Sequence, residues 1–347
     1  MSFSTRADAG RMSRTCCTLL QAAPRILLKG TVTLSTSPQC MSFFQFMSRK
    51  GRENCFRYLR RLGIPVWGLE LSPRGQRLLA TLFIEATELE WLDLGGGYFM
   101  WMDERIPQAI AAMRNLRTLH LQSPTKRAYD LLTKMQPLLT AVDADFWGYG
   151  AHPMDPVVVF APFKDTLEDM KVSWIFFNNR DSQFPLVTTL AAEQCRGPSL
   201  RTLTHCFPNL QGLHYTVGAL DRWRSLDYWR SENMASQALV RWPLLTWLSG
   251  NIVGLYMLGV RTNVNHLCVA SSALVTVDDS RQLRAVLSCV QGLQSLYLKV
   301  KVPDFDVSSV ARVLAPAKTT LAELMLRLEY HGERNGDLRS QTVSVSS

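Results

Sequence analysis

Apolar residues recur along the chain in a short motif of the form apolar-x-x-apolar-x-apolar, in which x is mostly polar. Seven clear copies have the apolar residues Leu89/Leu92/Leu94, Leu116/Leu119/Leu121, Leu167/Met170/Val172, Leu210/Leu213/Tyr215, Val264/Leu267/Val269, Leu293/Leu296/Leu298 and Leu321/Leu324/Leu326. The starts of successive copies lie 27, 51, 43, 54, 29 and 28 residues apart. Three intervals match a single unit and three match a doubled unit, so the motif predicts a repeat protein.

The last two apolar positions of each copy alternate with polar residues, as in a short β-strand that buries one side. One such strand cannot bury that side alone, whereas stacked parallel strands can. A period of 20 to 29 residues, with a strand and a helix in each unit, is typical of leucine-rich repeats. We therefore predict an α/β fold: an irregular leucine-rich-repeat solenoid, with an open arc of short parallel strands backed by helices. An ordinary α/β domain with leucine-containing strands is the alternative.

The three long intervals should each contain a weaker copy of the motif. Candidates are Leu139/Val142/Ala144, Val187/Leu190/Ala192 and Leu239/Trp242/Leu244, and a further weak copy precedes the others at Val66/Leu69/Leu71. The third candidate includes Pro243, which cannot donate to a strand ladder. The asparagine that follows the strand in regular leucine-rich repeats is missing, which indicates an irregular solenoid. The sequence predicts disorder at 1–10, a short N-terminal helical segment at 11–50, the solenoid at 51–330, and a polar, disordered tail at 331–347.

The formal charge of +9 is concentrated at the N-terminus. Residues 1–61 contain eleven Lys and Arg but two acidic residues, Asp8 and Glu53. The remainder holds 27 of the 38 basic and 27 of the 29 acidic residues, so the predicted solenoid is neutral. A basic N-terminus, with a run from Arg49 to Arg61, suggests nucleic acid or an acidic surface as an alternative partner. An amphipathic helix with solvated charges explains the run more simply, and nucleic acid is not the expected partner.

Several phrases of the N-terminal segment resemble a known family. They are Thr15-Cys16-Cys17-Thr18-Leu19, Arg25-Ile26-Leu27-Leu28, Val32-Thr33-Leu34, Phe43-Phe44-Gln45-Phe46 and Tyr58-Leu59-Arg60-Arg61-Leu62. Together with the repeats they resemble the F-box and leucine-rich-repeat proteins that are abundant in basidiomycete fungi. The residues before Arg11 do not match the proline-centred helix that leads an F-box, so this resemblance starts at residue 11.

The resemblance implies an F-box-type substrate-recognition or adaptor protein that holds a partner protein on the concave face of the solenoid. It also implies a Skp-type adaptor of a cullin-RING ubiquitin ligase as a second partner. The alternatives are a repeat scaffold unconnected to ubiquitin ligase and a protein that binds nucleic acid through the basic N-terminus.

The eight cysteines show no CxxC pair, which favours free thiols in a reducing compartment and a cytoplasmic or nuclear protein. Arg6, Arg11, Arg14 and Arg25 among serines and threonines would also suit a mitochondrial transit peptide, the alternative localisation. The apolar run 244–260 is short for a membrane span and contains Asn251, so we expect a buried helix and no membrane contact.

No combination of residues indicates catalysis, a cofactor or a metal. Gly95-Gly96-Gly97 lacks the GxGxxG spacing and the P-loop lysine of phosphate-binding loops. His205, Cys206 and His214 lack a second cysteine at zinc spacing and an orienting acid. The aromatic and arginine-rich run 223–230 would suit base stacking, but packing on the solenoid is the favoured interpretation. We therefore expect a protein that is not an enzyme.

In such folds the x positions that flank the last two apolar residues point outward from the concave strand face, where partners bind. The predicted partner-binding residues are Trp91, Asp93, Thr118, His120, Asp169, Lys171, His214, His266, Ser295, Tyr297, Glu323 and Met325. Aromatic side chains among polar neighbours suit a protein epitope, because they give a large contact area for little loss of rotamer freedom.

Overall fold

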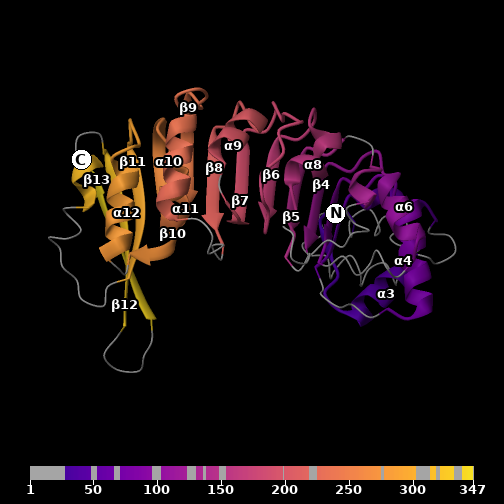
Figure 1. Cartoon of the computed structure of the whole chain (residues 1–347). Coiled ribbons are helices and arrows are strands. Elements are labelled where there is room, and N and C mark those ends of the chain that lie inside the picture. The colour runs from indigo at the N-terminus through magenta and orange to yellow at the C-terminus, as the bar shows by residue number, and fades with distance from the viewer. Residues whose placement is uncertain are drawn as a thin grey trace. The chain divides into compact units, whose positions relative to one another are not determined.

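The computed structural model describes residues 28–47, 53–65, 71–95, 103–122, 130–135, 138–147, 154–197, 199–218, 225–274, 277–301, 313–317, 321–331 and 338–346. Figure 1 labels most of its helices and strands. The chain divides into two compact units. Unit 1 comprises Met1–His152 and Val159–Leu167, and unit 2 comprises Pro153–Val158 and Glu168–Ser347.

The strands of unit 1 lie side by side in chain order and run parallel. They are β1 (Val32–Thr33), β2 (Arg61–Ile64), β3 (Trp91–Leu94), β4 (Thr118–Gln122) and β5 (Ala141–Asp145). Their register brings one apolar residue from each of β2 to β5 into a single row: Leu62, Leu92, Leu119 and Val142. None of these side chains is more than 3% exposed, so the row forms the core of the unit.

Helices cover the buried side of these strands. The described helical elements of unit 1 and of the segment before β6 are α3 (Ser37–Met47), η1 (Glu53–Tyr58), α4 (Pro73–Glu85), α6 (Arg105–Ala111), α8 (Pro156–Val159) and η2 (Ala161–Phe163). Helix α4 begins where Ser72 accepts a hydrogen bond from the Gly75 amide and Pro73 occupies the first helical position. Leu79, Leu82 and Phe83 then fall on one side of α4 and are buried.

Unit 2 repeats this plan with longer strands. They are β6 (Asp169–Ser173), β7 (Thr189–Cys195), β8 (Gly212–Val217), β9 (Leu244–Gly250), β10 (Asn263–Leu274), β11 (Ser295–Lys301), β12 (Glu323–His331) and β13 (Leu338–Ser346). Strands β6 to β12 are parallel neighbours in chain order. Their register forms one row of apolar residues: Met170, Leu190, Leu213, Leu248, Leu267, Leu296 and Leu324.

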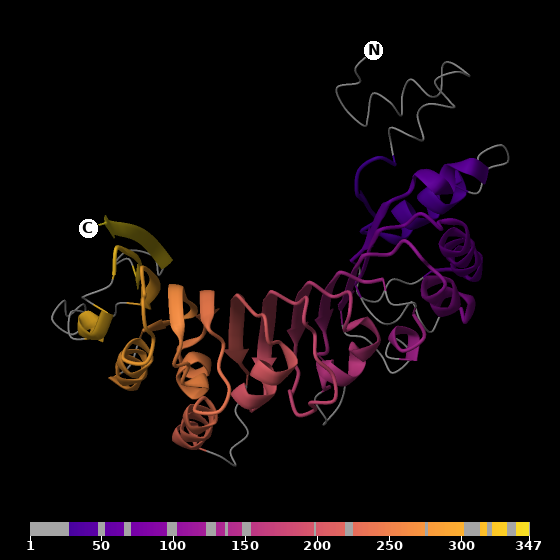
Figure 2. The same cartoon turned by 90° about the horizontal axis from the view of Figure 1, so that it is seen from above.

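The helices of unit 2 lie on one side of its strands (Figure 2). They are α9 (Leu200–Cys206), α10 (Leu226–Ser236), α11 (Ile252–Leu258), α12 (Val277–Leu287) and η3 (Ala315–Ala317). Asn251 caps the start of α11, and Gly259, with φ of 55°, ends it in the left-handed conformation that glycine adopts without strain. The side of the strands away from the helices is called strand face 1 in unit 1 and strand face 2 in unit 2.

The repeat motif correctly predicts most of these strands. All seven clear copies overlap a parallel strand, namely β3, β4, β6, β8, β10, β11 and β12. Two of the three weaker copies are also confirmed, because Val142 and Ala144 lie in β5 and Leu190 and Ala192 lie in β7, both in register with neighbouring repeats. The leucine-rich-repeat type of α/β fold is therefore present in each unit.

The third weaker copy, Leu239/Trp242/Leu244, is wrong. Strand β9 begins only at Leu244, and the register aligns Leu245 with Val264 and Leu248 with Leu213 and Leu267. The actual apolar positions of this repeat are thus Leu245, Leu248 and Gly250. The predicted helix over 244–260 is likewise replaced by β9 and α11. No helix in the described ranges is long and apolar enough to cross a membrane.

The two ends of the sheet also differ from the expectation. The weak copy Val66/Leu69/Leu71 falls largely outside the described residues, and the first full repeat uses Leu59, Leu62 and Ile64, all fully buried. Within the predicted helical segment 11–50, α3 is a helix but Val32–Thr33 is a strand paired with β2. Residues 1–27 lie outside the described part.

Most of the predicted disordered tail 331–347 is placed in β13, which pairs antiparallel with β12 from Glu323↔Ser346 to His331↔Leu338. In this pairing Val343 lies opposite Leu326 and Val345 lies opposite Leu324. The sequence predicts disorder here because the segment is mostly polar, although these two valines alternate with polar residues as in a strand.

Candidate functional site

The twelve predicted partner-binding residues all lie on the two strand faces. Trp91 and Asp93 of β3 align with Thr118 and His120 of β4 on strand face 1. The remaining eight lie on strand face 2, where the register aligns them in two rows: Asp169, His266, Ser295 and Glu323 in one, and Lys171, His214, Tyr297 and Met325 in the other. Each is half-buried or exposed and alternates with apolar residues along its strand. That these residues bind a partner stays a prediction.

The motif search does not identify the outward residues of the weak repeats. On strand face 1 these include Arg61, Asp143 and Asp145, and on strand face 2 they include Glu193, Trp247 and Ser249. The x positions of Leu139/Val142/Ala144 would have identified Asp143, whereas Asp145 and Glu193 follow the last apolar residue of their copies and are not x positions. No sequence signal identifies Trp247, because the predicted repeat of β9 begins at Leu239 and the actual one at Leu245.

Trp91 is the central aromatic residue of strand face 1. Its indole Nε1 donates a hydrogen bond of 3.2 Å to His120 Nε2, and the two ring centroids are 5.2 Å apart. The Arg61 guanidinium lies over the indole, 5.4 Å from its centroid, which is a cation–π geometry. The indole also reaches toward Gly63, where a Cβ would lie 3.4 Å from the ring. The Trp91 side chain is therefore fixed on three sides.

Two carboxylates flank His120. His120 Nδ1 lies 3.6 Å from Asp143 Oδ2. The pKa of Asp93 is raised, mainly by burial; His120 lowers this pKa and the Asp143 charge raises it. Asp93 Oδ1 is buried and accepts no hydrogen bond from the described residues. Asp145 accepts a hydrogen bond of 3.1 Å from the Trp147 amide.

Trp247 has the corresponding central place on strand face 2 and is 36% exposed. Its ring lies against Gly212, where a Cβ would be 3.5 Å away, and stacks on the His214 ring at a centroid distance of 6.2 Å and an angle of 17°. His214 Nδ1 lies 2.5 Å from Ser249 Oγ. Burial lowers the pKa of His214, with Glu193 acting in the opposite direction and Lys171 in the same direction, so the surroundings favour the neutral imidazole.

The chemistry of these groups does not resemble a catalytic site. Ser249 is 2% exposed, so a substrate cannot reach its hydroxyl beside His214. Burial raises the pKa of Cys206 to about 12, and its thiol contacts Asn179 O, whereas His205 Nε2 contacts Arg180 O. Across the part of the chain that the structure describes, no three His, Cys, Asp or Glu side chains are grouped to hold a metal ion.

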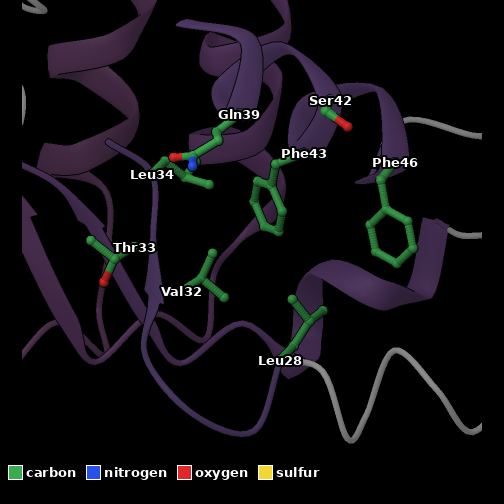
Figure 3. Close-up of a pocket in the computed structure, with 8 residues that line it drawn as sticks. All are labelled: Leu28, Val32, Thr33, Leu34, Gln39, Ser42, Phe43 and Phe46. Carbon is green, nitrogen blue, oxygen red and sulfur yellow. The ribbon is translucent and has the colours of Figure 1, made fainter. Parts of the chain in front are cut away.

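A separate apolar pocket of about 440 Å³ lies beside strand β1 and helix α3. Figure 3 shows the side chains of Leu28, Val32, Phe43 and Phe46 around the same space, with Thr33, Leu34, Gln39 and Ser42 completing the wall. The described lining carries no charge, so the pocket fits an apolar group and not a phosphate or a metal.

Comparisons with known proteins find similarity among solved structures. No family model matches the chain, and no curated protein matches it. Among solved structures, the leucine-rich-repeat-containing protein LegL7 from Legionella pneumophila is similar, with 13% sequence identity and a TM-score of 0.45 over 89% of this chain and 92% of that chain. The parallel strands and flanking helices described above give each unit the leucine-rich-repeat type of α/β fold.

Proposed function

We propose that this chain is a protein-binding scaffold that holds a partner polypeptide on its strand faces. The observation that carries the proposal is the presence, on each strand face, of a tryptophan locked against a histidine and surrounded by polar side chains. Trp91 packs on His120, and Trp247 packs on His214. Energetic hot spots of protein interfaces are enriched in tryptophan, and a side chain that is already held in place loses little entropy on binding.

The polar side chains around the tryptophans are spaced by the strand ladder. Between neighbouring strands, Lys171 Nζ lies 4.0 Å from Glu193 Oε1, and Ser295 Oγ donates a hydrogen bond of 3.2 Å to Glu323. Parallel strands place such groups about 4.8 Å apart from strand to strand, on a backbone held by hydrogen bonds. Such an array presents fixed donors and acceptors to a partner, as the polar rim of an interface does.

An exposed apolar turn in unit 2 is the competing surface. Leu239 and Val240, which follow α10, are 76% and 49% exposed. Exposed apolar side chains also favour protein contact. They lie in a turn, without the fixed aromatic rings and the polar rows of the strand faces, and therefore serve as the control surface in the test.

Selection of binding peptides from a phage-displayed random library against the full chain tests the proposal. Binding of the selected peptides should weaken about thirtyfold in Trp91→Ser or Trp247→Ser, because removing a hot-spot tryptophan costs about 2 kcal/mol or more. The matched variants Leu239→Ser and Val240→Ser should bind as the parent does. Fluorescence anisotropy with labelled peptides measures all of these affinities, and circular dichroism checks that each variant is folded. Loss of binding in the turn variants alone would overturn the proposal.

An F-box-type substrate-recognition role is a second, narrower candidate. It is supported by the resemblance of Arg25–Leu28, Val32–Leu34 and Phe43–Phe46, and by the apolar pocket to which each of these phrases contributes a side chain. Co-precipitation with a Skp-type adaptor tests it. A Phe43→Ser variant should reduce recovery of the adaptor, and recovery of no adaptor by the parent chain would reject this role and leave the scaffold proposal standing. A cytoplasmic or nuclear localisation remains a prediction that a fluorescent fusion would test.

A further inference from the structure

A second groove lies on the helix side of unit 1, between helices α4 and α6, which pack against each other (Figure 1). Its volume is about 460 Å³. Phe83 at the end of α4 and Met113 just after α6 line it and are no more than 4% exposed. Ile84 also lines it and is 47% exposed, although its side chain is large and apolar. The described residues therefore leave apolar surface of this groove uncovered.

The packing of the two helices determines the shape of this groove. Ala109 in α6 and Ala112 at its C-terminal end both line the groove, three residues apart and so on the same side of the helix. Their small side chains leave the space beside α4 open. Asn115, which follows α6, donates from Nδ2 to the Thr87 carbonyl oxygen at 3.1 Å and joins the two walls. The groove is therefore part of the helix packing and does not depend on a loop.

The charged side chains that line the groove are both arginines. They are Arg105 and Arg114, and the lining residues that the structure describes include no carboxylate. Asp103 accepts hydrogen bonds of 2.7 to 3.3 Å from Nε and Nη2 of Arg105. Arg114 is exposed and forms no ion pair within the described ranges. Its guanidinium thus gives the groove a positive charge beside the apolar surface.

The carboxylate of Asp103 is shared by more than one cation. Hydrogen bonds from Arg105 lower the pKa of Asp103 most, and the charge of Arg77 on α4 lowers it further. Glu88, an acidic residue that follows α4, is paired with Arg60 at 2.8 Å and does not line the groove. The arginines around the groove therefore exceed the carboxylates that face them, and an acidic partner complements this charge.

We propose that the groove between α4 and α6 docks an acidic amphipathic helix of a partner polypeptide. An apolar side chain of that helix would lie between α4 and α6, with carboxylates at Arg105 and Arg114. Amphipathic helices commonly dock in such grooves through apolar residues three or four positions apart, and guanidinium groups match carboxylates in geometry. The groove lies on the helix side, so the proposal goes beyond the function of the strand faces and does not depend on it.

A fatty acid also combines an apolar body with a carboxylate, but the groove fits a helix better. Sites for small molecules bury most of the surface of their ligand. Here the lining includes the exposed side chains of Ile84, Gln108 and Arg114, so the groove covers only one side of its occupant. An amphipathic helix buries one side and keeps the other in water, as this geometry requires.

Fluorescence anisotropy on the full chain tests the proposal with two labelled peptides. One is an alanine-based helical peptide with leucines three and four residues apart and glutamates beside them, and the other has lysine at every glutamate position. Ala109→Leu fills the groove, whereas Ala111→Leu adds the same side chain to a neighbouring groove that Ala109 does not line. Arg114→Gln removes the charge at the groove, and Arg74→Gln removes the same charge at the exposed start of α4.

The glutamate peptide should bind the parent chain, Ala111→Leu and Arg74→Gln equally. It should bind Ala109→Leu about tenfold more weakly, because the apolar anchor is excluded, and Arg114→Gln about threefold more weakly, because an exposed charge contributes modestly. The lysine peptide should not bind measurably. Circular dichroism checks that each variant is folded, and the two arginine variants provide a test that does not alter the packing of the helices.

Several results would overturn the proposal. They are no binding of the glutamate peptide by the parent chain, equal binding of the lysine peptide, and equal losses within either matched pair of variants. Calorimetric binding of oleate without binding of the peptide would assign the groove to a small ligand. A dimer in sedimentation that Ala109→Leu dissociates would assign it to a second copy of the chain. The dependence of library peptides on Trp91 and Trp247 is measured separately, so the scaffold function stands or fails independently.

Discussion

At the scale of the residue, Gly250 explains why the motif search does not find the repeat of β9. It occupies the third apolar position of its repeat, where the neighbouring repeats have Tyr215 and Val269. A Cβ at this position would overlap the carbonyl oxygen of Tyr215. Glycine is therefore required by close backbone approach, and a search for three apolar side chains cannot find it.

Gly250→Ala is expected to destabilise unit 2. The added methyl meets backbone, which cannot move aside as a flexible side chain can, so the free energy of unfolding should fall by about 2 to 3 kcal/mol. Gly212→Ala is the matched control on the adjacent strand, since its Cβ would make only ordinary contacts at 3.5 Å or more. Urea unfolding followed by circular dichroism compares the two, and a smaller loss for Gly250→Ala than for Gly212→Ala would contradict the proposed overlap.

Asp93 predicts a pH dependence. Because its folded-state pKa is raised, the folded protein holds the proton more tightly than the unfolded chain, and stability falls as pH rises through the interval above the ordinary carboxyl pKa. Asp93→Asn should therefore increase stability at neutral pH, and the gain should vanish in acid, where the parent carboxyl is protonated. Denaturant unfolding at both pH values measures this. A variant that is less stable than the parent at neutral pH would show that the ionised carboxylate is well accommodated.

At the scale of the element, the repeat pattern predicts strands better than the elements between them. A buried apolar pair in a short strand leaves a local signature, so β3, β4, β6, β8, β10, β11 and β12 can be found one at a time. Strand β13 cannot, because its alternation becomes meaningful only when β12 supplies the partner residues. The boundary between β9 and α11 is equally hidden, since 244–260 is apolar throughout except for a few positions.

Asn251 shows how a turn of this irregular solenoid is hydrogen-bonded without the asparagine that follows the strand in regular leucine-rich repeats. Its Oδ1 accepts from the Gly254 amide at 2.9 Å and caps α11, while its Nδ2 donates to Val217 O at 3.0 Å, which links the turn to the end of β8. One side chain therefore joins two adjacent repeats. This role depends on the stacking of the units and is not visible in the sequence.

Asn251→Ala should lower the free energy of unfolding by about 2 kcal/mol, because it removes a helix cap and leaves the Val217 carbonyl without this donor. Ser225→Ala provides the comparison, since Ser225 caps α10 at an exposed site by accepting from the Tyr228 amide, and should cost about 1 kcal/mol. Thermal and urea unfolding measure both. A loss for Asn251→Ala no larger than that for Ser225→Ala would show that Asn251 acts only as a cap.

At the scale of the whole molecule, the total charge of the sequence does not show how charged side chains are distributed over the strand faces. The residues after position 61 are neutral in total, yet the strand register collects Asp93, Asp143 and Asp145 on one strand face and balances the charges on the other. Asp93 is among the predicted partner-binding residues, whereas Asp143 and Asp145 belong to a weak repeat and are not. The fold class and most of the two strand faces can be predicted, but their charge and the fixed tryptophan–histidine pairs require the register.

Hydroxyl-radical footprinting of the chain in complex with a library-selected peptide tests the central claim most directly, because it reports contact without altering a residue. The account predicts that oxidation of Trp91 or Trp247 falls on binding, whereas oxidation of Leu239 and Val240 is unchanged. Protection of Leu239 and Val240, with both tryptophans oxidised as in the free chain, would contradict the account.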